Sequence, residues 1–343
     1  MNAPVPRPKK RVVSGIQPTG NLHLGNYLGA IRRWVKLQDE MAEADQILIF
    51  LADLHAITVY NDPAELRANV NGMAAALIAC GIDPDKALLF NHARVPAHPE
   101  LAWILSCTAR MGWLNRMTQF KEKSGKNREG ASVGLFAYPI LQAADVLLYQ
   151  ATHVPVGEDQ KQHVELMRDI ALKFNTDFDV DLFTAPEPHI GETAARIMSL
   201  RDGNAKMGKS DPSDMSRINL SDGDDLIAQK IRKAKTDPEP LPETMAELAD
   251  RPEARNLVTI YAALTDRTPA TVLTEFAGQG FGAFKPALAD LLIETLTPIR
   301  ARLADFERDP AALEAILVKG SEKAAALAVP TLEGAYRAVG LPR

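Results

Sequence analysis

Short apolar runs alternate with helix-like stretches over the first 200 residues, and this alternation constrains the fold more than any other feature. The runs cover residues 11–14, 46–51, 86–90 and, more weakly, 153–156. A run without polar alternation indicates a strand that is buried on both faces. Strands separated by helices of this length predict βαβ units, and therefore an α/β fold with a doubly wound parallel sheet.

Helix signals frame these strands and then continue alone. Residues 26–40 place apolar side chains on roughly one side of a helix. Asp62 followed by Pro63 is typical of a helix start, and Gly81 is suited to end that helix. After about residue 220 the strand signals stop and only helical periodicity remains. The chain therefore holds an α/β domain followed by an all-helical second domain.

Composition and charge limit the classes of protein to which the chain can belong. The net charge of −5 over 343 residues excludes a strongly basic nucleic-acid binder, but not RNA contact through a local patch. No apolar run approaches the ~18–20 residues that span a bilayer. Residues 1–11 are rich in proline and basic residues without an apolar core behind them, unlike a signal peptide. We therefore expect a cytoplasmic protein with a loose basic tail and no membrane partner.

Cysteine and histidine spacing predicts neither disulfides nor metal. Cys80 and Cys107 form no C-x-x-C pair, so both are expected in the core. The seven histidines show no H-E-x-x-H or similar ligand spacing. A structural metal site is therefore not expected.

A glycine-rich turn joins the first expected strand to the first long helix, at residues 14–26. Free N–H groups and the helix dipole make such a turn an anion site. His23 and Asn26 lie three residues apart on one face of the starting helix, where their donors can reach a phosphate. The alternative is a glycine-rich turn with a hydrogen-bonded structural histidine, and the turn alone does not decide between them.

A second glycine-containing stretch, residues 203–210, matches the phosphate-loop pattern G-x-x-x-x-G-K-S letter for letter. A true phosphate loop runs directly into a helix, whereas Asp211-Pro212-Ser213-Asp214 is turn chemistry. The stretch also follows the end of the α/β part instead of its first strand. We therefore interpret it as a mobile loop in which Lys206 and Lys209 can grip a polyphosphate.

These two motifs together resemble the HIGH and KMSKS signatures of class I aminoacyl-tRNA synthetases. The first is His-Leu-Gly-Asn at 23–26 and the second is Lys-Met-Gly-Lys-Ser at 206–210. Further stretches are similar to the bacterial tryptophanyl-tRNA synthetases within that class: residues 14–18, 117–123, 143–145 and 154–163. The resemblance covers nearly the whole chain, from about residue 12 to residue 343.

The resemblance implies three regions. Residues 1–200 would form a Rossmann-like catalytic domain, with a dimer-interface segment near 90–150. Residues 201–306 would hold the lysine loop and a helical anticodon-binding domain. Residues 307–343 would be helices that pack back on the catalytic domain. The implied partners are ATP, L-tryptophan, tRNA(Trp) and a second copy of the chain in a homodimer.

The implied reaction joins L-tryptophan to ATP, releases pyrophosphate and then transfers tryptophan to tRNA(Trp). The substrate carboxylate attacks the α-phosphate itself, so catalysis is positioning and electrostatic stabilisation, with Mg²⁺ arriving on ATP. The residues implied to act on the phosphates are His23, Asn26, Lys123, Lys206 and Lys209. The residues implied to contact ATP are Gln17, Pro18, Thr19, Gly25, Asn26, Gly157, Glu158, Asp159, Ile197, Lys206, Met207, Gly208, Lys209 and Ser210.

Asp145 is the candidate for amino-acid choice. It stands in an apolar helical stretch, where a carboxylate either caps a structural group or accepts a hydrogen bond from a ligand; the residues alone leave both open. The resemblance favours the tryptophan indole N–H. Tyr138 and Gln160 are candidates for the substrate ammonium, and His55 is a further pocket candidate.

The chain departs from the family pattern at two positions. Gly208 replaces the usual serine of the lysine loop, which removes a hydroxyl and adds flexibility. Gln142 stands where methionine is expected beside the amino-acid pocket.

Two basic clusters are candidates for tRNA contact. The first is Arg110, Arg116, Lys121, Lys123, Lys126 and Arg128, and the second is Lys230, Arg232, Lys233 and Lys235.

Three other functions are alternatives to a synthetase for tryptophan. A tyrosyl-tRNA synthetase shares the architecture but should differ at residues 157–160. A small-molecule nucleotidyltransferase should lack the lysine loop, and a non-catalytic RNA-binding relative should have lost His23 or the lysines.

Overall fold

The computed structural model describes residues 10–18, 20, 22–42, 45–117, 130–155, 161–189, 196–209 and 211–342. The basic tail expected before residue 10 lies outside these ranges. Among the described residues, none of the helices is both long enough and apolar enough to cross a membrane.

Five parallel strands form one sheet in the order β3-β2-β1-β4-β5. The strands are β1 (Arg11–Ile16), β2 (Gln46–Leu51), β3 (Ala87–Asn91), β4 (His153–Pro155) and β5 (Glu187–His189). The four expected strands and the doubly wound parallel sheet are confirmed. β5 was missed because its Glu-Pro-His sequence carries no apolar run. The order reverses between β1 and β4, and ligands of such sheets bind beyond the carboxyl ends of the strands at this point.

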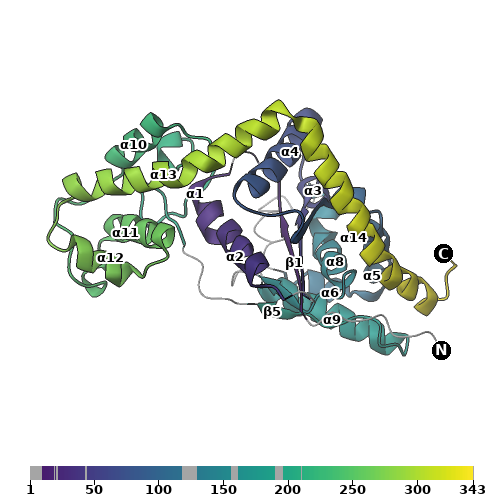
Figure 1. Ribbon diagram of the computed structural model, residues 1–343. Helices are drawn as coiled ribbons and strands as arrows, with labels where there is room; N and C mark the ends of the chain where they lie inside the picture. The colour runs from purple at the N-terminus through teal and green to yellow at the C-terminus, as the bar shows by residue number, and fades with distance from the viewer. Residues whose placement is uncertain are drawn as a thin grey trace.

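Helices cover both faces of the sheet (Figure 1). In chain order they are α1 (Leu24–Asn26), the π-helical η1 (Tyr27–Ile31), α2 (Arg32–Glu40), α3 (Asp53–Ala56), α4 (Pro63–Ala79), η2 (His92–Arg94), α5 (Ala97–Thr108), α6 (Met111–Leu114), α8 (Val133–Leu147), α9 (Lys161–Asp177), η4 (Asp214–Ser216), α10 (Asp224–Lys233), η5 (Ala246–Leu248), α11 (Pro252–Thr265), α12 (Pro269–Phe276), α13 (Phe281–Arg308) and α14 (Pro310–Ala338).

Helix boundaries follow the expected local chemistry. Asp62 caps α4 by accepting hydrogen bonds from the backbone N–H groups of Ala64 and Glu65, with Pro63 at the first helical position. Gly81 follows that helix with a φ of +113°, a conformation that suits glycine. The helix expected over 26–40 is instead divided into α1, η1 and α2.

Alternate residues of each strand enter two different cores, one on each side of the sheet. In β2, Ile47, Ile49 and Leu51 join one core, whereas Leu48 and Phe50 join the other. The first core continues into α10–α13, and the second contains side chains of α5, α8, α9 and α14. This period of two is what a strand buried on both faces requires.

From η4 onward the described elements are all helical, with α10–α12 clustered along one end of α13 and α14 returning to the sheet (Figure 1). α14 lies directly on β3: a Cβ added at Gly320 would stand 1.9 Å from the carbonyl oxygen of Leu89. Only glycine therefore permits this approach of helix to strand. Of the two cysteines, Cys80 is buried as expected, but Cys107 is exposed on α5, which corrects the expectation for that residue.

Candidate active site

His23 and Asn26 form a reciprocal cap at the start of α1. The Nδ1 atom of His23 accepts a hydrogen bond from the backbone N–H of Gly25 at 3.1 Å, and the Oδ1 atom of Asn26 accepts one from the backbone N–H of His23 at 3.1 Å. This is the geometry of a capping box, with histidine in the place of serine or threonine. His23 is therefore also the hydrogen-bonded structural histidine of the alternative interpretation.

The cap also fixes the chemistry of the His23 ring. Burial, together with the charges of Lys209, Arg217 and Lys206, lowers the pKa of His23 to about 4. The ring is neutral near pH 7 and carries one proton. Because Nδ1 accepts from Gly25, that proton is on Nε2. The ring can thus serve as a cap on one side and donate a neutral hydrogen bond on the other.

The lysine loop lies against this turn. The backbone N–H of Leu24 donates to the carbonyl of Ile218 at 2.8 Å, and that of Leu220 donates to the carbonyl of Leu22 at 3.0 Å. A Cβ added at Gly20, whose φ is +59°, would lie 3.8 Å from Nζ of Lys209. The first strand–helix turn and a loop almost 190 residues later in the chain therefore form one surface.

The loop residues differ in burial. Met207 is buried, and its backbone N–H donates to the carbonyl of Ile197, whose side chain is also buried. Lys206 is exposed, whereas Lys209 is half-buried. Burial and the charge of Arg217 lower the pKa of Lys209 to about 8. A cation held partly out of water beside a helix N-terminus is suited to binding a polyphosphate.

Rejection of the phosphate-loop interpretation is confirmed. Within the described residues 211–223 the chain forms only the three-residue η4, and the next α-helix, α10, begins at Asp224. A phosphate loop would need a helix directly after Lys209.

Lys230 of α10 anchors the segment that follows the loop. Its side chain is fully buried, and its Nζ atom lies 2.6 Å from a carboxylate oxygen of both Asp214 and Asp222. Asp214 also contacts Arg217 at 3.1 Å. The expectation that Lys230 contacts tRNA is therefore wrong, because the residue lies on the same apolar helix face as Ile227 and Ile231. Lys235 of the same cluster is paired with Glu253 at 2.7 Å.

Replacing Lys230 by methionine should strongly destabilise the fold. The change keeps the length of the side chain but leaves Asp222, which is 6% exposed, without its cation. Breaking a buried ion pair in this way costs roughly 3–5 kcal/mol of unfolding free energy. Urea denaturation followed by circular dichroism measures this loss. The control is Lys233→Met on the exposed side of α10; equal denaturation midpoints for the two variants would contradict the anchoring role.

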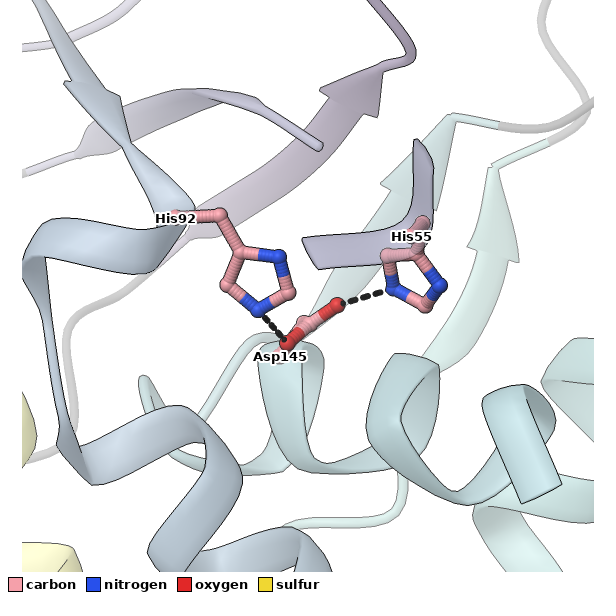
Figure 2. A group of neighbouring side chains, drawn as sticks. All are labelled: His55, His92 and Asp145. Atoms are coloured by element: carbon pink, nitrogen blue, oxygen red, sulfur yellow. Dashed lines mark hydrogen bonds and ion pairs between the residues drawn. The ribbon is translucent and has the colours of Figure 1, made fainter. Parts of the chain in front are cut away.

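Asp145 lies at the centre of a buried histidine cluster. Its side chain is 0% exposed, and its Oδ2 atom lies 2.9 Å from Nε2 of His55. Its Oδ1 atom lies 2.7 Å from Nδ1 of His98 and 2.6 Å from Nε2 of His92. Figure 2 shows His55 and His92 on opposite sides of the carboxylate. The contact with His92 is short, although neither ring nitrogen of His92 forms a hydrogen bond of good geometry.

The histidines keep Asp145 ionised. Burial alone would raise the pKa of Asp145, but the contacts with His92, His55 and His98 outweigh burial and hold this pKa well below its usual range. The pKa of His98 is lowered to about 4 because its own burial outweighs the attraction of Asp145. An ionised carboxylate thus lies in an apolar setting with its hydrogen-bond donors arranged around it, which is a strong acceptor for a further N–H group.

Three of these side chains follow the carboxyl ends of neighbouring strands. His55 comes after β2, and His92 and His98 come after β3. The aromatic ring of Phe50, the penultimate residue of β2, lies 5.2 Å from the His92 ring and covers the backbone of Gly15 in β1. A Cβ at Gly15 would stand 2.4 Å from that ring. Phe50 therefore joins the histidine cluster to the start of the glycine-rich turn.

Tyr138 extends the cluster toward α9. Its ring packs edge-on against His55, and its hydroxyl lies 3.1 Å from Nε2 of buried His163. Asp145, Tyr138 and His55, taken as one pocket from the sequence, are thus brought together, whereas His92, His98 and His163 were missed as part of it. Position directly after a strand could have pointed to His92. The expected site residues Thr19, Lys123, Gly157, Glu158, Asp159, Gln160 and Ser210 lie outside the described residues.

The remaining expected residues lie on the first turn, on α8 and in the lysine loop. Gln17 is exposed, Pro18 is buried, and Gly25 is partly exposed with Met207 nearby. Gln142 is partly exposed on α8. Gly208 is partly exposed within the lysine loop.

The side chains around Asp145 also form a set of candidate metal ligands. Ligand atoms of His55, His92 and Asp145 all lie within 4.8 Å of one another, a grouping that the sequence spacing gave no reason to expect. Imidazole and carboxylate are ligands that zinc accepts. However, both carboxylate oxygens already contact histidine nitrogens at 2.6–2.9 Å, and these contacts account for the clustering.

Comparison with known proteins places these features in a family. The chain matches the family model described as tRNA synthetases class I (W and Y) over residues 6–297. A tryptophan–tRNA ligase from Caulobacter vibrioides is 60% identical over 331 residues, which cover 96% of this chain and 95% of that protein. A tryptophan–tRNA ligase from Rhizobium meliloti is 54% identical over 351 residues, covering 97% and 98%.

A solved structure agrees. The tryptophanyl-tRNA synthetase of Campylobacter jejuni, complexed with ADP and tryptophan, superimposes with a TM-score of 0.81 at 34% identity. The match covers 96% of this chain and 100% of that one. Family, sequence relatives and fold agree with the motifs at residues 23–26 and 206–210. The chain therefore belongs to the class I tRNA synthetases for tryptophan and tyrosine, within the group of tryptophan–tRNA ligases.

Proposed function

We propose that this chain activates L-tryptophan with ATP, forming tryptophanyl-adenylate and pyrophosphate, and then transfers tryptophan to tRNA(Trp). The observation that carries the proposal is the position of Lys209 against Gly20 of the glycine-rich turn, whose start at Gly15 is joined through Phe50 to the buried cluster around Asp145. One half of this surface suits a polyphosphate and the other half suits an apolar ligand with one N–H donor.

In the first step the carboxylate oxygen of tryptophan attacks the α-phosphorus of ATP. The new bond joins this oxygen to phosphorus, and the bond to the bridging oxygen of pyrophosphate breaks. No protein nucleophile is needed. The Nε2–H of His23 and the ammonium of Lys209 stabilise charge on the phosphates as it develops, and Asn26 holds His23 in place. Lys206 and Lys123 are proposed for the departing pyrophosphate, and Mg²⁺ accompanies ATP on its phosphates.

ATP lies along the turn in this proposal. Gln17, Pro18, Thr19, Gly25 and Asn26 contact it from the first strand–helix junction, and Gly157, Glu158 and Asp159 contact its nucleoside. Ile197, Met207, Gly208 and Ser210 complete the site. Supporting this placement, the junction stands at the carboxyl end of β1, beside the reversal of strand order.

Tryptophan lies over the histidine cluster. Asp145 accepts the indole N–H, while Tyr138 and Gln160 bind the ammonium group and His55 borders the pocket. The ligands of the Campylobacter jejuni enzyme, ADP and tryptophan, support both halves of the site.

Transfer requires tRNA and is proposed to occur in a homodimer. Arg110 and Arg116 belong to the basic segment proposed for the acceptor end, and exposed Arg232 and Lys233 to the one proposed for the anticodon side. Within the proposed interface, residues 90–150, Trp103 is 74% exposed and Met111 is 66% exposed. Large exposed apolar side chains of this kind favour a protein–protein contact.

ATP–pyrophosphate exchange tested with each amino acid in turn is the direct test of activation. We expect exchange with tryptophan and little with tyrosine or phenylalanine. Exchange that prefers tyrosine, or exchange that no amino acid supports, would contradict the proposed function. Charging of a tRNA(Trp) transcript then tests the second step.

ATP affinity should fall as the pH rises through about 8. In the free protein Lys209 loses its proton near that pH. Bound phosphate favours the charged form, so ATP binding takes up a proton there, and affinity falls by up to about tenfold per pH unit above it. Titration calorimetry between pH 7 and 9.5 measures this dependence. The control is Lys209→Arg, which stays charged and should flatten the profile; an unchanged slope in this variant would contradict the assignment to Lys209.

A further inference from the structure

Tyr149 makes a contact that places it in the Asp145 cluster, although it lies outside the motifs. It lies two residues after the last residue of α8, is fully buried, and its hydroxyl lies 2.8 Å from Nε2 of His98. Nδ1 of the same ring lies 2.7 Å from Oδ1 of Asp145. The hydroxyl, the imidazole and the carboxylate thus form one buried hydrogen-bonded relay.

The positions of the protons in this relay follow from counting hydrogen-bond donors and acceptors. Burial, with the charge of Asp145, raises the pKa of Tyr149, so the hydroxyl keeps its proton. His98 is neutral and holds a single ring proton. If that proton were on Nε2, a lone pair of Nδ1 would face the carboxylate. With the proton on Nδ1, the ring donates to Asp145 and accepts from Tyr149, and each polar atom is satisfied.

The same count gives the orientation of the carboxylate. Oδ1 of Asp145 contacts both His98 and His92, whereas Oδ2 contacts His55 alone among the described residues. Each carboxylate oxygen has two acceptor positions. Two ring nitrogens within 2.7 Å of Oδ1 leave no room for a ligand there, so the acceptor position that remains is on Oδ2, and the hydrogen bond from His98 to Oδ1 determines where it points.

We propose that Tyr149 and His98 are positioning residues for amino-acid selection: the Tyr149 hydroxyl holds His98 as the Nδ1–H tautomer, which fixes the Asp145 carboxylate so that Oδ2 accepts the N–H of the substrate. The proposal rests on the proposed role of Asp145 in binding tryptophan. In this arrangement neither Tyr149 nor His98 touches the substrate, and both act through Asp145.

Tyr149→Phe removes the hydroxyl and keeps the ring. His98 can then place its proton on Nε2, and Asp145 loses a donor. We expect KM for tryptophan to rise about tenfold, within the range of couplings between residues in contact, while kcat and KM for ATP stay unchanged. Tyr261→Phe in α11 is the matched control, since the Tyr261 ring packs against Phe276 and Phe284 in the helical part.

His98→Asn separates the tautomer from packing. The asparagine amide can donate near the Nδ1 position, has no tautomer to lose, and is too short to reach Tyr149. Adding Tyr149→Phe to this background should therefore leave KM for tryptophan unchanged. A tenfold rise in both backgrounds, or in neither, would overturn the proposal.

Nitrogen NMR of histidine-labelled, substrate-free protein reads the tautomer directly, with His98→Asn assigning the signal. We expect Nδ1–H in the native protein and a shift toward Nε2–H in Tyr149→Phe. The Nε2–H form in the native protein would overturn the proposal regardless of Asp145. If the tautomer shifts but tryptophan selectivity does not, Asp145→Asn distinguishes the two failures: unchanged selectivity there means that the proposed function of Asp145 fails, whereas altered selectivity overturns the positioning role alone.

Discussion

Replacing His23 by alanine should lower the rate of adenylate formation by about 10²-fold or more. The ring is neutral and its single proton is on Nε2, because Nδ1 accepts from Gly25. A donor already oriented toward phosphate loses no energy to reorganisation when charge develops, and one such transition-state donor is worth roughly 2.7–4 kcal/mol. Tryptophan binding should barely change. Single-turnover measurement of adenylate formation gives the chemical step.

The cap complicates this variant and also supplies its control. Loss of a capping side chain costs about 0.5–2 kcal/mol of stability, so His23→Ala affects folding as well as chemistry. Asparagine is a favoured N-cap residue but is too short to present a donor where Nε2 stands. His23→Asn should therefore keep the melting temperature near that of the native protein and still be slow. Normal adenylation in this variant would remove His23 from the chemical step.

The fold could be predicted to the extent that each element carries its own apolar pattern. Residues 47–51 are apolar throughout, and with Gln46 in front of them they match β2 at both ends, because both faces of this strand are covered. β5 has only three residues at the sheet edge and is held by backbone pairing to β4, so its sequence contains no comparable signal. The π-helical turn at Tyr27–Ile31 likewise left no mark in the apolar spacing.

The candidate site likewise has one part that could be predicted from the sequence and one part that could not. The residues of the turn follow one another in the sequence, and so do those of the lysine loop, so each motif could be recognised on its own. The cluster around Asp145 could not, since His92, His98 and Tyr149 meet only after β3 and α8 are packed together. Lys230 shows the opposite error: it was grouped with its basic neighbours, although its spacing from Ile227 and Ile231 places it on the buried face of α10.

Replacing Asp145 by asparagine should cut kcat/KM for tryptophan at least about tenfold. A hydrogen bond to a charged acceptor contributes about 1.5–3 kcal/mol, and the amide that replaces Oδ2 would present its own N–H to the indole. Phenylalanine has no donor to lose, so discrimination against it should fall by a similar factor. ATP affinity should stay nearly constant, because among the described residues the carboxylate contacts histidines and not the phosphate turn.

The geometry decides which measurement can test this role. Asp145 is not a helix cap, because its carboxylate contacts His55, His92 and His98. Asp145→Ala would leave the hydrogen-bonding nitrogens of His55 and His98 without an acceptor, each at about 1–3 kcal/mol, so a lower melting temperature is expected whether or not the residue selects the substrate. Selectivity alone is informative. Exchange rates with tryptophan, tyrosine and phenylalanine should be compared in Asp145→Asn and in the control Asp169→Asn on the exposed side of α9. If Asp145→Asn keeps the native order and ratio of rates, the carboxylate serves the histidines only, and the indole N–H must be recognised by another group.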